Sequence, residues 1–323
     1  MAAAEYREEP CRSALNKVSG MSFKWSLNPY TGCVHRCTFC FVRAFEKRAD
    51  RPYDDRYGTS IRVKTNLVEV LRKELARPKW AHELVVIGTA TDPCQPAEGR
   101  YRLTRASIAA LADARNPLSI ITRGPLIVRD VDVLVEADRR ASATVTFSVP
   151  TLDPEIWRKT EPGTAPPRQR LRALTTLIGA GIQASVGMAP ILPGISDRPE
   201  LLADVVKAAR DAGATSLWTN VLYLRPGTRE HFLDKLARDW PELVPMYERL
   251  YRDRAYLGKT EQEPVRREVA DLRHRFDIAD RRRVRILPAP DDESAASATQ
   301  LELALHEAWA STHGADSGAR QAS

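Results

Sequence analysis

Short apolar runs alternate with longer amphipathic segments over the first two thirds of the chain. The apolar runs have the length of strands and predict them at Lys24–Asn28, Leu84–Gly88, Leu118–Thr122, Thr144–Val149, Ala184–Met188 and Ser216–Asn220. The segments between them carry apolar residues at helical spacing and predict helices at Asn66–Ala76, Arg105–Asp113, Asp130–Ala137, Pro167–Ala180 and Pro199–Asp211. This alternation is typical of βαβ units, so we predict an α/β fold whose parallel sheet closes into a partial barrel.

Polar and special residues gather where the predicted strands end. In a parallel barrel the loops after the strands meet at one mouth, which is where active sites lie. The loops that would meet there contain residues 33–40, residues 88–92, Arg123, Ser148, residues 188–190 and residues 219–220. The pattern therefore predicts a functional site at this mouth.

The pattern changes after Pro241. Helices are predicted at Met246–Tyr256 and Pro264–Asp280, followed by a short apolar run at Val284–Leu287. The remaining residues are rich in Ala, Ser and Asp, with one weak helical pattern at Thr299–Ala310. We expect a flexible N-terminal arm over residues 1–20, a core over 21–235, a basic helical appendage over 236–288, and a low-order tail over 289–323.

Three cysteines give the strongest chemical signal. Cys33, Cys37 and Cys40 form a C-x-x-x-C-x-x-C motif, and no fourth cysteine lies close to them in the sequence. Three thiolates on one loop can hold three corners of a [4Fe–4S] cluster, which normally takes four. The fourth iron would then be open to a small molecule, and S-adenosylmethionine is a cofactor of such radical chemistry.

The motif and its neighbours resemble the radical SAM superfamily, and more narrowly its branch related to spore photoproduct lyase. The resemblance rests on Asn28-Pro29-Tyr30, Gly32, the three cysteines and Arg43, and it continues downstream through residues 89–105, 121–130, 147–153 and 189–197. It implies a (β/α)6 partial TIM-like barrel and a [4Fe–4S] cluster on Cys33, Cys37 and Cys40. It also implies reductive cleavage of S-adenosylmethionine to a 5′-deoxyadenosyl radical, and a flavodoxin or ferredoxin-type electron donor.

The resemblance also assigns residues to the cofactor. Phe39 is the aromatic residue that the superfamily places before the last cysteine. The positions that would contact the amino group, the carboxylate and the ribose of S-adenosylmethionine are Thr89, Thr91, Asp92, Arg123 and Ser148. The alternative is that Thr89, Thr91 and Asp92 form a turn and cap the following helix, since Thr and Asp are common caps.

Cys94 is an additional thiol near the predicted mouth. In spore photoproduct lyase a cysteine donates a hydrogen atom to the substrate radical, which makes Cys94 a catalytic candidate. The shared Thr-x-Asp pattern, however, aligns that cysteine with Thr89. Thymine-dimer reversal is therefore in doubt, and the other interpretation of Cys94 is a small packing residue.

A second class of function is a non-catalytic iron–sulfur or zinc-binding protein. His35 lies between Cys33 and Cys37, so the sequence contains the four ligands of a possible Cys3His zinc site. Structural zinc sites usually take ligands from two separated knuckles, which disfavours four ligands within eight residues. A loop-shaping or hydrogen-bonding role for His35 is the alternative.

Charge and composition limit the choice of partners and compartment. The net charge is +7 and the pI is about 9.2, which permits nucleic acid as a partner, and thus DNA lesion repair, without requiring it. The N-terminus lacks the apolar stretch of a signal peptide, and no segment has the apolar length of a membrane span. With only five cysteines in 323 residues and no secretory segment, we expect a cytoplasmic protein that does not enter the membrane.

Overall fold

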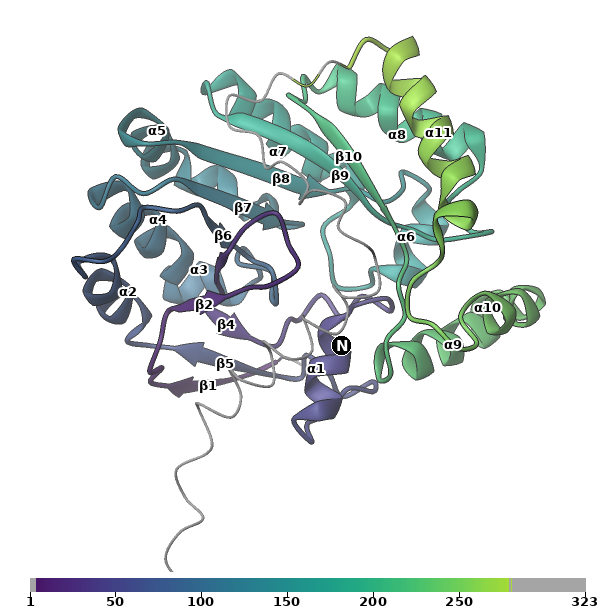
Figure 1. Ribbon diagram of the computed structural model, residues 1–323, viewed down its shortest axis with the longest axis horizontal. Coiled ribbons are helices and arrows are strands. Elements are labelled where there is room, and N and C mark those ends of the chain that lie inside the picture. The colour runs from purple at the N-terminus through teal and green to yellow at the C-terminus, as the bar shows by residue number, and fades with distance from the viewer. Residues whose placement is uncertain (1–3, 279, 281–323) are drawn as a thin grey trace, which may run out of the picture.

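The computed structural model describes residues 4–278 and 280 (Figure 1). The strands are β1 (Glu5–Glu9), β2 (Leu15–Lys17), β3 (Trp25–Leu27), β4 (Tyr30–Thr31), β5 (Ser60–Lys64), β6 (Val85–Ile87), β7 (Leu118–Thr122), β8 (Ala143–Ser148), β9 (Gln183–Ile191) and β10 (Leu217–Val221). The α-helices are α1 (Val42–Arg48), α2 (Leu67–Leu75), α3 (Ala97–Tyr101), α4 (Leu103–Asp113), α5 (Val131–Arg140), α6 (Pro154–Thr160), α7 (Pro167–Gly179), α8 (Pro199–Asp211), α9 (Thr228–Asp239), α10 (Val244–Leu250) and α11 (Lys259–Arg275). Two short 3-10 helices, at Pro125–Asp130 and Pro241–Leu243, complete the set.

A seven-stranded sheet forms the frame, in the order β10-β9-β8-β7-β6-β3-β2. Each strand from β3 to β10 in this order is parallel to its neighbour, and only β2 runs antiparallel, against β3. The parallel strands are the six that the sequence predicts, and helices follow them along the curved sheet (Figure 1). The predicted α/β partial barrel is confirmed.

The two faces of the sheet differ in polarity because side chains alternate along each strand. Phe147 and Val186 pair in register and are fully buried in the core beneath the helices. The next row, on the opposite face, consists of Ser148, Gly187 and Trp218. One row deeper on that face, Thr146 and Ser185 share a hydrogen bond of 2.8 Å. The concave face therefore offers hydroxyl groups and one partly exposed indole instead of an apolar core.

The last three helices of the described chain, α9, α10 and α11, pack on the barrel. α11 lies against α8 and β10 and buries Val269 and Leu272 in the main core. α9 and α10 form a second apolar cluster, in which Phe232 and Tyr247 join Phe39 from the cysteine loop. The predicted helices at Met246–Tyr256 and Pro264–Asp280 correspond to α10 and α11, each shifted a few residues toward the N-terminus. The predictions for 281–323, including Thr299–Ala310, lie outside the described residues.

The N-terminal segment differs from the flexible arm expected over residues 1–20. β1 pairs in parallel with β5, and β2 extends the main sheet. The carboxylate of Glu74 accepts hydrogen bonds from the backbone N–H groups of Ala14 (3.2 Å) and Leu15 (2.8 Å). Asn66 Oδ1 accepts a hydrogen bond from the Cys11 N–H at 2.7 Å, and Asn66 Nδ2 donates one to the Cys11 carbonyl at 3.1 Å. These long-range partners fix the segment, and its own sequence gives no sign of them.

Candidate functional site

The cysteine loop runs between β4 and α1, at the end of the barrel where the strands finish. Cys33 and Cys37 are buried and Cys40 is partly exposed. Burial raises the pKa of the Cys37 thiol; Arg123 opposes this, and the charges at Glu161, Cys40 and Cys33 add to it. The three thiols are thus close enough to sense one another electrostatically.

The loop after β6 holds the first cysteine in place. Gln95 is fully buried; its Nε2 donates to the Gly32 carbonyl at 3.1 Å, and its Oε1 accepts from the Val34 N–H at 3.1 Å. Thr91 Oγ1 donates to the same Gly32 carbonyl at 2.6 Å. The backbone on both sides of Cys33 is therefore hydrogen-bonded to side chains from the neighbouring β/α unit.

The segment after α6 supports the other side of the loop. The Thr38 N–H donates to the Thr160 carbonyl at 2.9 Å, and the Gly163 N–H donates to the His35 carbonyl at 3.1 Å. A Cβ at position 163 would lie 2.4 Å from the Val34 carbonyl oxygen, closer than real Cβ contacts allow. Glycine is thus required here by close backbone approach.

Arg43 fastens the residues that follow the cysteines. Its guanidinium is buried, lies 4.7 Å from the centroid of the Tyr57 ring, and donates to the carbonyls of Tyr53 and Asp54, each at 2.6 Å. Its Nε reaches the Cys37 carbonyl at 3.4 Å. The segment Phe45–Ser60 is therefore anchored to the cysteine loop along its second half.

Asp92 is occupied by contacts within the protein. Its Oδ1 accepts from Thr122 Oγ1 at 2.7 Å and from the Cys94 N–H at 2.9 Å, and its Oδ2 accepts from the Arg123 N–H at 2.6 Å. Oδ2 also lies 3.4 Å from His35 Nδ1. Burial would raise the pKa of Asp92, but His35 and these donors outweigh burial and lower the pKa to about 2. The carboxylate therefore orients His35 and the strand ends.

The donor set fits a cluster better than a single ion. In the part of the chain that the structure describes, no three His, Cys, Asp or Glu side chains are grouped as ligands of one metal ion. A four-iron cube does not need that spacing, because each thiolate binds a different iron. The His35 imidazole faces Asp92, so it is held as a positioning group.

A buried ion network lies beside the loop. Glu161 is fully buried, and its Oε1 accepts from Arg123 Nε at 2.6 Å. Arg170, also fully buried, donates to both oxygens of Glu161 at 3.2 Å and to the Ser148 carbonyl at 2.8 Å. Arg123 reaches the Ala189 carbonyl at 3.2 Å, as does Ser148 Oγ at 2.8 Å. The network links the ends of β7, β8 and β9.

The structure brings most of the predicted cofactor residues to this mouth. Arg123 lies 5.6 Å from the centroid of the Phe39 ring, and Thr89 Oγ1 accepts from Asn28 Nδ2 at 3.2 Å. The side chains of Thr91 and Asp92 hold the loop, but neither caps the following helix, whose N-cap residue is Pro96.

The Cys94 side chain lies in the main core of the protein. It is 3% exposed in the main core, and burial raises the pKa of its thiol far above the usual range. A Cβ on Gly124 would lie 2.7 Å from the Cys94 Cβ, so the two residues are packed against each other. This environment is typical of a packing residue and not of a residue that donates a hydrogen atom to a substrate at the mouth.

Several residues of the site escaped sequence analysis. They are Gln95, Glu161, Gly163, Arg170 and Trp218. Each acts on a residue far away in the chain, and polar residues within helical or loop patterns normally face solvent. Only Gly163, in the run EPGTAPP, carries a local sign of a special turn.

The comparisons with known proteins decide the family. Residues 27–206 match the Radical SAM superfamily. The chain belongs to that superfamily. Radical SAM enzymes use a [4Fe–4S] cluster and S-adenosylmethionine and need an electron donor.

The chain is also similar to several relatives and, in its fold, to a solved structure. The chain is 40% identical over 294 residues to uncharacterized proteins of Mycobacterium tuberculosis and Mycobacterium bovis, covering 90% of this chain and 85% of theirs. It is 27% identical over 169 residues to a radical SAM Nα-GlyT isomerase of Pseudomonas phage M6. Spore photoproduct lyase with bound AdoMet and dinucleoside spore photoproduct has the same fold, with a TM-score of 0.64 at 15% identity over 84% of this chain and 79% of that one.

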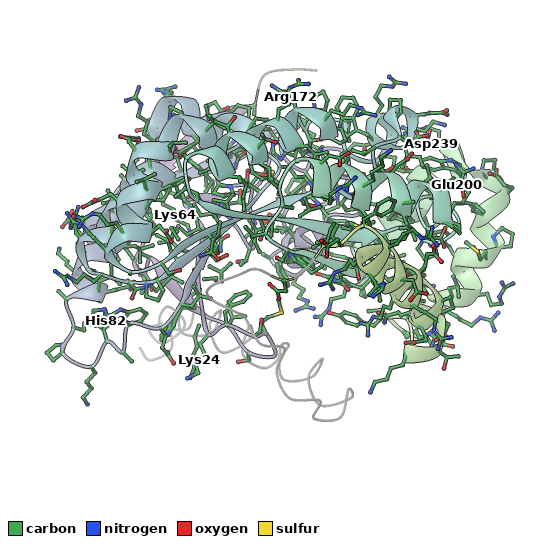
Figure 2. All side chains as sticks on the ribbon, turned by 90° about the horizontal axis from the view of Figure 1, so that it is seen from above. Lys24, Lys64, His82, Arg172, Glu200 and Asp239 are labelled. Carbon is green, nitrogen blue, oxygen red and sulfur yellow. The ribbon has the colours of Figure 1, made fainter. Side chains whose placement is uncertain are left out.

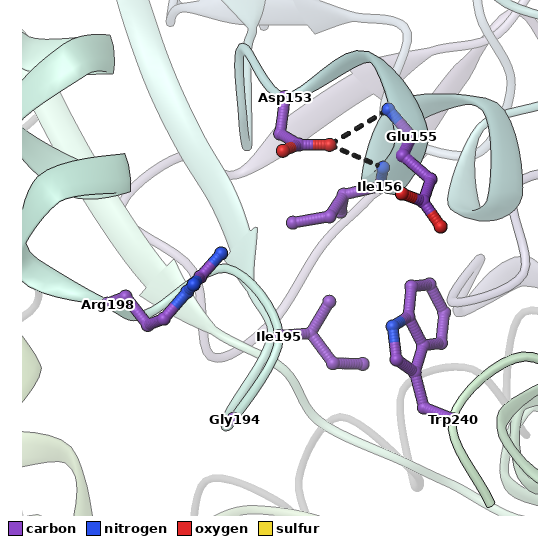
Figure 3. Close-up of a pocket in the computed structure, with 7 residues that line it drawn as sticks. All are labelled: Asp153, Glu155, Ile156, Gly194, Ile195, Arg198 and Trp240. Carbon is purple, nitrogen blue, oxygen red and sulfur yellow. Dashed lines mark hydrogen bonds between the residues drawn. The ribbon is translucent and has the colours of Figure 1, made fainter.

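A cavity lies near the second apolar cluster, because two of its lining residues, Ile156 and Ile195, belong to the cluster that contains Phe39. It has about 290 Å³ and lies between α6, the loop after β9 and the end of α9 (Figure 3). Asp153 caps α6 by accepting from the N–H groups of Glu155 (2.8 Å) and Ile156 (2.9 Å). Arg198 and Trp240 flank the cavity on opposite sides.

A helix that spans a membrane needs both sufficient length and high hydropathy. None of the helices of the described residues reaches both.

Proposed function

We propose that the protein cleaves S-adenosylmethionine reductively at a [4Fe–4S] cluster held by Cys33, Cys37 and Cys40. The 5′-deoxyadenosyl radical would then abstract a hydrogen atom from a substrate. The observation that carries this proposal is the three-thiol loop at the barrel mouth, which is braced on one side by Gln95 and on the other by Gly163. A loop held this way keeps its thiolates in position before the cluster is assembled.

The surrounding residues have distinct proposed roles. When bound, the cluster supplies the single electron that breaks the sulfonium C–S bond. Arg123 is held by Glu161 and next to Phe39, so it offers a fixed cation for the carboxylate of the cofactor. Thr89 and Ser148 supply hydroxyl groups for its amino and ribose groups. Thr91 and Asp92 position the loop.

The test is anaerobic reconstitution followed by product analysis. With dithionite and S-adenosylmethionine, the wild type should form 5′-deoxyadenosine, and a Cys37→Ala variant should form none. A Cys11→Ala variant is the matched control, since Cys11 lies beside β1, away from the loop. A wild type that binds four irons and sulfide but never forms 5′-deoxyadenosine would contradict the proposal. Iron and sulfide analysis separates it from a zinc protein.

For the substrate we propose nucleic acid. Trp218 is 37% exposed on the concave face, over Gly187, where a Cβ would lie 2.7 Å from the indole. An indole in such a place can stack on a base. The net charge of +7 and the dinucleoside bound by spore photoproduct lyase support the same class. Binding of a labelled single-stranded oligonucleotide should weaken as salt rises, and a Trp218→Ala variant should bind it less tightly. Absence of binding at low salt would rule this class out.

A further inference from the structure

A series of aromatic rings leads from the cysteine loop to the surface. Phe41 follows Cys40 directly, and its ring centroid lies 5.9 Å from that of Tyr223. Tyr223 stacks on Tyr256 at 4.8 Å with only 12° between the ring planes. Tyr256 is 42% exposed, whereas burial raises the pKa of Tyr223 well above its usual value, with further increases from Tyr256 and Cys40. The rings therefore connect the most exposed of the three cysteines with solvent.

The backbone holds this series in place from two distant segments. Tyr223 follows β10, and Tyr256 lies between α10 and α11. The Leu224 N–H donates to the Ala255 carbonyl at 2.8 Å, which joins the two segments next to the stacked rings. The guanidinium of the buried Arg225 lies 5.9 Å from the centroid of the Tyr256 ring. The outer ring is thus fixed against the protein on one side and open on the other.

The surface next to Tyr256 is basic. Arg249, Arg252 and Arg254 are exposed, and together with Asp253 they line a hollow of about 360 Å³. We call Arg249, Arg252, Arg254 and Tyr256 the Tyr256 patch. Arg254 pairs with Glu261, but within residues 4–278 and 280 neither Arg249 nor Arg252 has a carboxylate partner. The hollow therefore has two arginines without a salt-bridge partner in the described chain and one acidic residue, Asp253, and it lies close in sequence to the exposed Tyr256 ring.

We infer that the Tyr256 patch is the docking surface for an acidic one-electron carrier protein, which delivers its electron beside Cys40. This inference rests on the proposed function. One electron leaves the reduced carrier, which is oxidised by one electron, and the cluster is reduced by one electron. Tunnelling falls steeply with distance, so a carrier must dock close to the cluster loop, and the aromatic series connects the Tyr256 patch with that loop. Charge complementarity between the patch and an acidic carrier steers and orients the encounter.

Nucleic acid is the other anion that such a patch could meet. Base stacking would use only the outermost ring and gives no reason for Tyr223 and Phe41 to continue inward to Cys40. An electron carrier uses the whole series, and the observations therefore favour the protein partner.

The experiment compares two double charge reversals in the reconstituted protein. R249E/R252E alters the patch, and R168E/R172E is the matched control on the exposed side of α7, which lies apart from α10 in Figure 1; Figure 2 shows Arg172 at the surface. Binding of purified oxidised flavodoxin, and separately of a ferredoxin, is measured by calorimetry at low and high salt. R249E/R252E should weaken binding by about tenfold or more at low salt, and the control should bind like the wild type.

A second readout separates this inference from the proposed function. With reduced flavodoxin as the donor, R249E/R252E and Tyr256→Ala should form 5′-deoxyadenosine at least about tenfold more slowly. With dithionite, which needs no docking surface, both should match the wild type. Equal carrier binding by both double variants, no carrier binding by the wild type, or loss of oligonucleotide binding in place of carrier binding would overturn the inference. Failure with dithionite in the wild type would instead count against the proposed function.

Discussion

The carboxylate of Glu161 lies 2.6 Å from Nε of Arg123, in a part of the barrel where Glu161 has no exposed surface. Burial would raise the pKa of Glu161, but Arg170 and Arg123 outweigh burial and lower the pKa. Two residues further on, the Gly163 N–H donates a hydrogen bond to the His35 carbonyl in the cysteine loop. One short segment after α6 thus fixes both the cation at the mouth and the loop that carries the thiols.

Neutralising this carboxylate should be costly. Glu161→Gln would leave Arg170 and Arg123 without their shared counter-ion in a buried place, and breaking a buried pair in this way costs about 3 kcal/mol. Urea unfolding should show that loss. Glu155→Gln is the control, because Glu155 forms an exposed pair with Lys159 worth at most about 1 kcal/mol. Equal losses in the two variants would show that the network is not stabilising.

A methyl group at position 163 should disturb the cysteine loop. In a Gly163→Ala variant the new Cβ would clash with the Val34 carbonyl and with the Cα of His35, 2.8 Å away, so the loop must shift. We expect less iron and sulfide bound per protein after reconstitution, and a loss of about 1–3 kcal/mol in stability. Gly179→Ala is the control, since no atom lies within 4 Å of its Cβ position. That variant should keep its iron; normal iron content in Gly163→Ala would refute the prediction.

Removing the Cys94 thiol should affect stability more than chemistry. Cys94 packs in the main core against Gly124, so a Cys94→Ala variant leaves a small cavity and loses about 1 kcal/mol of unfolding free energy. The variant should still form 5′-deoxyadenosine with dithionite. A variant as stable as the wild type would show that the thiol does not pack as described.

His231 should make stability depend on pH. Burial lowers the pKa of His231, the nearby Arg43 and Lys235 lower it further, Asp55 and Asp234 oppose them, and the result is about 4 compared with an ordinary 6.5. The unfolded chain therefore binds the proton first, and stability falls as the pH drops from about 6.5 to about 4. Urea midpoints measured across this window should show the fall, and a His231→Gln variant should show less of it. The same dependence in both proteins would assign it to other groups.

The sequence alone determined the order of the elements and the place of the chemistry. Alternation of apolar and polar positions is a local property, so the six parallel strands and the five longer helices between them could be predicted from it, whereas the short α1, α3 and α6 were missed. The cysteine spacing is also local and indicated the cluster motif. Because strand ends in a parallel sheet point the same way, the mouth could be located without coordinates.

Tertiary structure alone decided how the loop is held and which polar groups are already engaged. Asp92 was assigned to the cofactor, but its oxygens accept hydrogen bonds from Thr122, Arg123 and Cys94, whose positions depend on strand register. Glu161 is buried because two arginines from different elements surround it. The N-terminal strands form because β1 pairs with β5 and because the carboxylate of Glu74 accepts a hydrogen bond from the backbone at the start of β2. Most of these contacts join residues that lie far apart in the sequence, and their energies depend on distances that no local pattern records.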